Sequence, residues 1–376
     1  MHGNNVPGCY ASEAEVLAMA QAARRAGYAV YETAGAPGDK GLEGLLEIGK
    51  QVTVTFTLPE AGMSRSLEWL QKANAGDSTV IGQVFARAQG LLLGLEGVIQ
   101  VRDDPLLTLY HAGLADCASF LLPDSHCVWS DPLCAVPQPF SVRSETFLAM
   151  RHKPLPEIVA QLREPAVRAA ILDEYDASEG VGVPSVDGDP LPYKVSENFE
   201  NMWVMNGGGA TMAFDYEPEP SISVAALAEQ RGVRPQEIIL DAMLEDDGKG
   251  VVWYPYAHGY SERNYDNVRI GMEGCEAGLC VMGNADAGAH VAAFTDASCT
   301  TFMLTHWARD RTRGDVMPLE LLVKLNSRDP ARMYGWTDRG TLEVGMRADI
   351  NVIDVSRQTS CGSCANPCFP CAVQFS

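Results

Sequence analysis

The feature that most constrains the fold is a regular alternation of short apolar strands and helices in the first 85 residues. Strand-like runs at Tyr28–Thr33, Val52–Leu58 and Thr79–Phe85 are separated by helical patterns, and a capping-box pattern at Ser12–Glu15 opens a helix before the first of them. Strands that alternate with helices are typical of βαβ units, in which neighbouring strands are parallel. The second run alternates apolar residues with threonines and carries no charge, as expected where both faces of a sheet are covered. The sequence therefore predicts an α/β fold with a parallel sheet.

A long departure from this alternation follows Phe85. Residues from about 86 to 277 show no repeat, although helical patterns are legible at Ser223–Arg231 and Pro235–Glu245. Val251–Pro255 is typical of a strand, and we expect the proline to end it. So long an interruption indicates an inserted subdomain or lid rather than a loop. The α/β pattern resumes with the strand Gly278–Asp286 and an amphipathic helix over Asp296–Arg311.

The candidate catalytic residues lie where this last strand ends. Its apolar run gives way to a turn rich in glycine and alanine that contains Asp286 and, four residues later, His290. In parallel α/β folds the carboxyl ends of strands carry the chemistry, so Asp286 is a natural catalytic position. Small neighbours would let a substrate or metal approach the backbone closely. The spacing fits equally well an aspartate that caps the next helix and a histidine that only stabilises the turn.

Other histidines and cysteines favour structural roles. His306 falls on the apolar helix and is expected to be packed, and no base is placed near Cys299, which is expected in the core. Two Cys-x-x-Cys pairs, Cys361/Cys364 and Cys368/Cys371, could chelate zinc. The pairs are closer together than in zinc knuckles, and the stretch has no hydrophobic pattern, so we expect residues 356–376 to be an unstructured tail.

The composition limits the classes of binding partner and the cellular location that we expect. The formal net charge of −21 argues against nucleic acid and anionic membranes. We find no apolar run long enough to span a bilayer and no secretory signal, so we expect a cytoplasmic protein.

Several stretches resemble a known family. Asn284–His290, with Asp296–Ser298 and Leu304–Trp307, is similar to the eighth-strand region of the N-acyl-D-amino-acid deacylases (D-aminoacylases). Gly340–Asp354, which ends in a strand-like run, is similar to the signature by which amidohydrolases return from their barrel to a small β domain. Asn326–Arg332 fits the same family.

The resemblance implies a metal-dependent, TIM-like (β/α)8 barrel that hydrolyses a linear amide, with a small-molecule N-acyl amino acid as substrate. It assigns the four strands to strands five to eight. Residues 1–340 would be a partial barrel, and 341–355 the start of a composite β domain. It implies a divalent metal, zinc by analogy, with Asp286 as metal ligand and proton shuttle and His290 in the same site.

Departures from the family pattern keep other hypotheses open. The chain has no His-x-His pair, and Glu32 and threonines stand where many amidohydrolases have histidine ligands. One carboxylate cannot hold a catalytic zinc, which needs about three protein ligands. We therefore expect a C-terminal fragment of a barrel, whose sheet a second copy could complete as a homo-oligomer. The alternatives are a cyclic amidohydrolase of the dihydropyrimidinase type and a non-catalytic remnant or scaffold.

Overall fold

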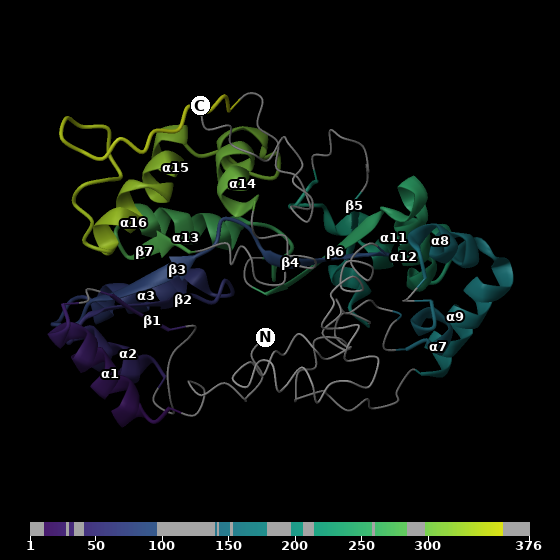
Figure 1. The fold of residues 1–376 in the computed structure, drawn as a ribbon, viewed down its shortest axis with the longest axis horizontal. Coiled ribbons are helices and arrows are strands. Elements are labelled where there is room, and N and C mark those ends of the chain that lie inside the picture. The colour runs from purple at the N-terminus through teal and green to yellow at the C-terminus, as the bar shows by residue number, and fades with distance from the viewer. Residues whose placement is uncertain are drawn as a thin grey trace. The chain divides into compact units, whose positions relative to one another are not determined.

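The computed structural model describes residues 11–27, 30–33, 41–95, 140, 143–150, 153–178, 197–205, 214–257, 260–283 and 298–355. Contacts divide the chain into two compact units (Figure 1). The insertion unit spans Gly90–Tyr256. The sheet unit contains the chain before it and most of the chain after it.

The sheet unit is built on four parallel strands in the order β1-β2-β3-β7. They are β1 (Val30–Thr33), β2 (Thr53–Thr57), β3 (Val80–Val84) and β7 (Cys280–Met282). All four lie within the strands that the sequence predicts, and the expected parallel sheet is confirmed. The strand expected to run to Asp286 is described only as far as Met282, because residues 284–297 lie outside the described part.

Helices connect and cover these strands. The helical elements of the sheet unit are α1 (Glu13–Arg25), α2 (Leu42–Gly49), α3 (Met63–Ala73), α13 (Asp266–Glu276), α14 (Cys299–Thr305), the π-helical turn η10 (His306–Asp310), α15 (Leu319–Asn326) and α16 (Arg328–Met333). Ser12 caps α1 by accepting a hydrogen bond from the Glu15 amide at 3.2 Å, so the predicted capping interaction is confirmed. The helix expected over Asp296–Arg311 is interrupted: its described part changes from α-helix to a π-helical turn at His306.

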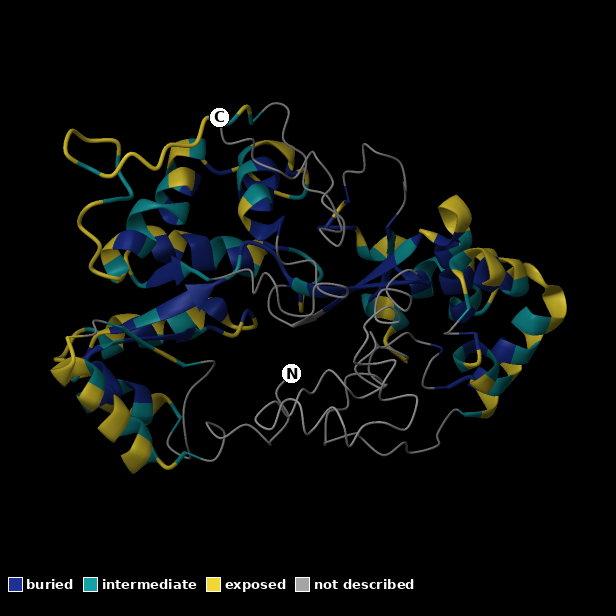
Figure 2. Cartoon of the chain, in the orientation of Figure 1, coloured by how far each residue is buried: buried dark blue, intermediate teal, exposed yellow. Residues whose placement is uncertain are grey.

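The two faces of the parallel sheet differ in chemistry. Phe56 of β2 meets Trp69 of α3 edge-to-face at 6.2 Å, so this face packs against the helices. Gly271 of α13 faces Val84 of β3 so closely that an added Cβ would lie 3.0 Å from it. The opposite face carries the threonines of β2. Figure 2 shows the strands as mostly buried and α1 as exposed on its outer side.

The insertion unit combines a small sheet with short helices. Its strands, in the order β4-β6-β5, are β4 (Gln89–Gly94), β6 (Val251–Ala257) and β5 (Trp203–Met205), with β5 antiparallel to β6. Its helical elements are α7 (Glu145–Leu148), α8 (Leu155–Arg163), α9 (Pro165–Ala177), η6 (Phe199–Asn201), η7 (Pro220–Ile222), α11 (Val224–Arg231), α12 (Pro235–Leu244) and η8 (Glu245–Gly248). One apolar cluster joins them, with Leu162, Ile239 and Leu240 fully buried. At Gly90 an added Cβ would lie 2.1 Å from the Trp253 indole nitrogen, so only glycine fits.

The compact insertion unit is Gly90–Tyr256, and α13 packs on α3 and β7 of the parallel sheet. One expectation about the strands of the insertion unit differs from the structure. Pro255 does not end β6, which continues to Ala257: β5 pairs with β6 only as far as Trp253, so the proline removes no hydrogen bond of this pairing.

The strand-like run that ends at Asp354 forms no strand. Within 341–355 the described backbone makes few hydrogen bonds, and Val344 and Val352 are almost fully exposed. A strand needs a neighbour for its ladder, and the described residues supply none there. The exposed C-terminal segment is visible in Figure 2 as the yellow trace beyond α16.

Candidate functional site at the carboxyl edge of the parallel sheet

Polar residues gather where the parallel strands end. Glu60 follows β2, Arg87 follows β3, and the segment 284–297, which contains Asp286 and His290, follows β7. Because the carboxyl ends of parallel strands share one edge of the sheet, Glu60 and Arg87 lie at the same edge. Asp286 and His290 themselves lie outside the described residues.

Arg87 is the most buried cation of this edge, with no exposed surface. Its Nη1 donates a hydrogen bond to Ser298 Oγ at 3.1 Å, and its guanidinium lies 5.4 Å from the centre of the Phe302 ring. Ser298 is itself buried and immediately precedes α14. Burial of an arginine is costly unless its charge and donors are satisfied, so its place at a strand end indicates a specific role there.

The segment that carries Asp286 is anchored at both ends to the end of β3. At its start, the Gly283 amide donates to the Val84 carbonyl at 2.6 Å. At its finish, Ser298 accepts the bond from Arg87. Val84 and Arg87 are three positions apart, so Gly283 and Ser298 are both held at one short stretch of the carboxyl edge.

Glu60 joins the loop after β2 to the chain that returns from the insertion unit. Its carboxylate accepts hydrogen bonds from the Ser261 hydroxyl and, at 3.2 Å, from the Ser261 amide. Its other oxygen accepts from Asn267 Nδ2 at 3.4 Å. Both carboxylate oxygens are therefore occupied, and Glu60 is only 5% exposed. We interpret it as a structural carboxylate that fixes this edge.

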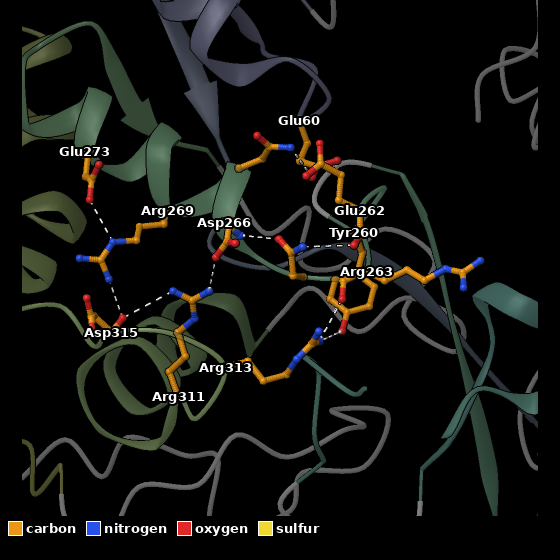
Figure 3. A network of polar contacts seen from close by, with 12 residues as sticks. Glu60, Tyr260, Glu262, Arg263, Asp266, Arg269, Glu273, Arg311, Arg313 and Asp315 are labelled. Atoms are coloured by element: carbon orange, nitrogen blue, oxygen red, sulfur yellow. Dashed lines mark hydrogen bonds and ion pairs between the residues drawn. The ribbon is translucent and has the colours of Figure 1, made fainter. Parts of the chain in front are cut away.

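An arginine network supports the edge from the helix side (Figure 3). Arg311, whose side chain is 1% exposed, binds Asp266 at 3.0 Å and stacks on Trp307 at 4.7 Å. Trp307 in turn donates from Nε1 to the Ala86 carbonyl at 2.7 Å, one residue before Arg87. The network thus connects α13 and η10 to the end of β3.

Arg313 extends this network. It donates to the Tyr260 hydroxyl at 3.0 Å and to the Arg263 carbonyl at 2.9 Å, which draws the 260–267 stretch towards the residues after η10.

The histidine and cysteines assigned to structural roles are found in the core. His306 is buried and stacks on Phe302 at 4.5 Å, and Cys299 is buried as a free thiol, so both predictions are confirmed. Cys275 and Cys280 are also buried and free. A hydrogen bond between their thiols, together with burial, raises the pKa of Cys275 well above its ordinary value. The tail cysteines lie outside the described residues.

Sequence reasoning missed Glu60, Arg87 and Ser298. The signal for the first two was their position just after a predicted strand, which had been used only for Asp286. Ser298 belongs to a stretch that resembles the family, but no local pattern predicts its contact with Arg87, which spans 211 positions.

Comparison with protein families decides the ancestry of the chain. The model of the amidohydrolase family matches residues 13–361. The chain belongs to the amidohydrolase family. No curated protein and no solved structure gives a significant match. No helix among the described residues is long and apolar enough to cross a membrane.

Amidohydrolases are generally metal-dependent, and the described residues do not fit a catalytic metal. Within them no three His, Cys, Asp or Glu side chains converge on a common point. At the carboxyl edge Glu60 is fully engaged and Arg87 contributes a positive charge, which disfavours a nearby cation. Any metal ligands at this edge would have to come from outside the described part, where Asp286 and His290 lie.

Proposed function

We propose that this amidohydrolase acts on the linear amide bond of an N-acyl amino acid, as the D-aminoacylases do. The observation that carries the proposal is the double anchoring of the Asp286 segment to the end of β3. Together with the family match over residues 13–361, it supports a catalytic edge at the carboxyl ends of the strands. We further propose that the four strands are strands five to eight of a TIM-like barrel.

In this proposal Asp286 moves the proton. A carboxylate at a strand end takes a proton from the attacking water and returns it to the leaving amine, which an amide side chain cannot do. His290 is proposed to lie in the same site. The zinc or other divalent ion implied by the family would be bound with Asp286 as one ligand. Because the described residues do not complete a metal site, no step of the proposed mechanism passes through a metal.

The test compares substrates and one substitution. The full chain is assayed on N-acetyl-D-alanine, on its L enantiomer and on dihydrouracil, with and without added zinc. We expect release of D-alanine and a loss of about 100-fold or more in Asp286→Asn, in the range for a general acid–base. Asp338→Asn is the matched control, because Asp338 is exposed and its carboxylate pairs with the neighbouring Arg339.

Three other outcomes would each contradict one part of the proposal. Turnover of dihydrouracil alone would favour a cyclic amidohydrolase. Absence of turnover, with metal content that falls only when the tail cysteines are changed to serine, would favour a non-catalytic scaffold. An unchanged rate in Asp286→Asn would remove that residue from the mechanism.

A further inference from the structure

Two cysteines flank the turn that connects α13 to β7. Cys275 lies in the last turn of α13, Cys280 is the first residue of β7, and each is only 2% exposed. Both are free thiols. Four residues separate them in sequence, so the conformation of this one turn determines how closely their side chains approach.

The turn is a Schellman motif, which reverses the chain directly after a helix. The Leu279 amide donates to the Gly274 carbonyl at 3.0 Å, and the Gly278 amide donates to the Cys275 carbonyl at 3.0 Å. Gly278 has the left-handed backbone that this motif requires, with a φ of 77°. The chain therefore returns beside the end of α13, and α13 packs on β7.

The two thiols need little movement to become a disulfide. They form a hydrogen bond with each other, so their sulfur atoms are already neighbours. A disulfide cannot form where the two side chains point apart. The contact between the thiols shows that these side chains converge. Bond formation therefore requires a shift of the sulfur atoms rather than a rearrangement of the fold.

The thiol pair lies beneath an exposed turn. Glu276, Ala277 and Gly278 are exposed, and Leu279 is half-buried. A Cβ added to Gly278 would meet no atom of the described residues within 4 Å, so the turn is not packed at this point. Exposed turns with few packing contacts open at a lower free energy than the whole fold. A small reagent can therefore reach the thiols through local opening.

The surroundings of Cys275 keep its thiol protonated. The hydrogen bond with Cys280 and burial raise the pKa of Cys275 well above its ordinary value, and Asp329 adds to the rise while Lys324 opposes it. Asp329 and Lys324 form an ion pair at 3.2 Å. Because the thiolate is the reactive form of cysteine, this pair is unsuited to act as a fast nucleophile. It suits a response to a sustained oxidising condition.

We propose that Cys275 and Cys280 form a reversible disulfide that joins the end of α13 to β7. The oxidant is a small-molecule disulfide. The thiolate of one cysteine attacks a sulfur of the oxidant, and the proton lost by that cysteine passes to the thiolate that leaves. The second cysteine then displaces the remaining half of the oxidant in the same way. Two cysteine thiols are oxidised to one disulfide, and the oxidant is reduced to two thiols.

The disulfide would hold a short strand at the border of the sheet. β7 has three residues, and β3 is its one neighbour among the described strands. The first residue of β7 would be bonded to α13, while Gly283, directly after its last residue, is held at the Val84 carbonyl. We therefore expect oxidation to slow the opening of β7. This modification requires no substrate and no turnover, so it is independent of the proposed hydrolysis.

The experiment is a redox titration of the full chain in buffers with defined ratios of reduced and oxidised glutathione. Samples start from reduced and from oxidised protein, so that equilibrium is approached from both sides. Free thiols are alkylated, and mass spectrometry of peptides locates each disulfide. The variants are Cys275→Ala and Cys280→Ala. Cys299→Ala is the matched control, because it also removes a buried free thiol.

We expect the parent and Cys299→Ala to give a peptide that contains a Cys275–Cys280 bond and is lighter by two hydrogens than the reduced peptide. Both starting points should give the same oxidised fraction at each glutathione ratio. In the oxidised parent, hydrogen exchange of the β7 amides should slow by about tenfold. The same oxidising buffer should leave this exchange unchanged in Cys275→Ala and in Cys280→Ala.

Three results would overturn the inference. They are a pair that stays reduced in oxidised glutathione alone, a bond from Cys275 or Cys280 to any other cysteine in place of the one between them, and oxidation that leaves β7 exchange unchanged. If an alanine variant does not fold, the serine variant at that position takes its place. The bond located in the parent and in Cys299→Ala decides the outcome even if neither variant folds.

Discussion

The sheet unit and the insertion unit bury very different groups. The core of the insertion unit is one apolar cluster that includes Leu162, Ile239 and Leu240. The carboxyl edge of the sheet unit instead buries Arg87, Ser298 and Glu60, each held by contacts distant in sequence. Buried polar groups are expensive and are retained where position matters. The insertion unit also buries polar residues, Arg143, Glu217 and Gln236 among them, but its core is a large apolar cluster, whereas the carboxyl edge of the sheet unit is organised by polar groups held in place.

The largest loss of stability is expected when a core side chain of the insertion unit is removed. Leu240→Ala removes a fully buried side chain of α12 and should lower the free energy of unfolding of that unit by about 3 kcal/mol. Leu342→Ala, at an 84% exposed position, is the control and should change it by less than about 0.5 kcal/mol. Hydrogen exchange measured by mass spectrometry reports the two units separately.

For Leu240→Ala, protection should fall in peptides from Gly90–Tyr256 and stay unchanged in β1, β2 and β3. An equal loss in both units would mean that they unfold together, and the comparison would lose its basis.

A smaller effect is expected at the carboxyl edge. Arg87→Met keeps much of the side-chain volume but removes the buried hydrogen bond to Ser298, at a cost of about 2 kcal/mol. The loss of protection should concentrate in β3 and in α14, the two elements that Arg87 joins. Arg65→Met, at an exposed position of α3, is the matched control and should have little effect.

One result would contradict this role of Arg87. If Arg87→Met is as stable as Arg65→Met, the buried arginine does not organise the edge, and the anchoring of the Asp286 segment loses one of its two contacts.

Local patterns predicted the local structure well and the long-range structure poorly. The strands of the sheet and the Ser12 cap depend on neighbours in sequence, so alternation and the capping pattern were sufficient. The Arg87–Ser298 contact and the Glu60 contacts with Ser261 and Asn267 depend on the path of the chain through the insertion unit, which no local pattern encodes. The exposed run before Asp354 has the composition of a strand, but composition cannot supply the neighbour that a strand requires.

The smallest loss of stability is expected at a polar contact inside the insertion unit. It tests whether a buried polar group also stabilises this unit. Glu174 of α9 accepts hydrogen bonds from the Ser144 hydroxyl at 2.6 Å and from the Thr146 hydroxyl at 2.6 Å and amide at 3.0 Å, which join α9 to the start of α7. Burial alone would raise the pKa of Glu174, but these hydrogen bonds outweigh it and lower the pKa below the ordinary value of 4.5.

A carboxylate whose pKa is lower in the folded state contributes stability that is complete above the unfolded pKa and is lost as the pH falls through the folded pKa. Glu174→Gln should therefore cost about 1 kcal/mol at neutral pH, and the difference from the parent should shrink as the pH falls below about 4.5. Urea unfolding at pH 7 and at pH 3 measures both values, with Glu157→Gln on exposed α8 surface as the control. A difference that is the same at both pH values would show that charge at Glu174 contributes nothing. The insertion unit would then gain nothing from the charge of this carboxylate, and its contrast with the carboxyl edge would be sharper.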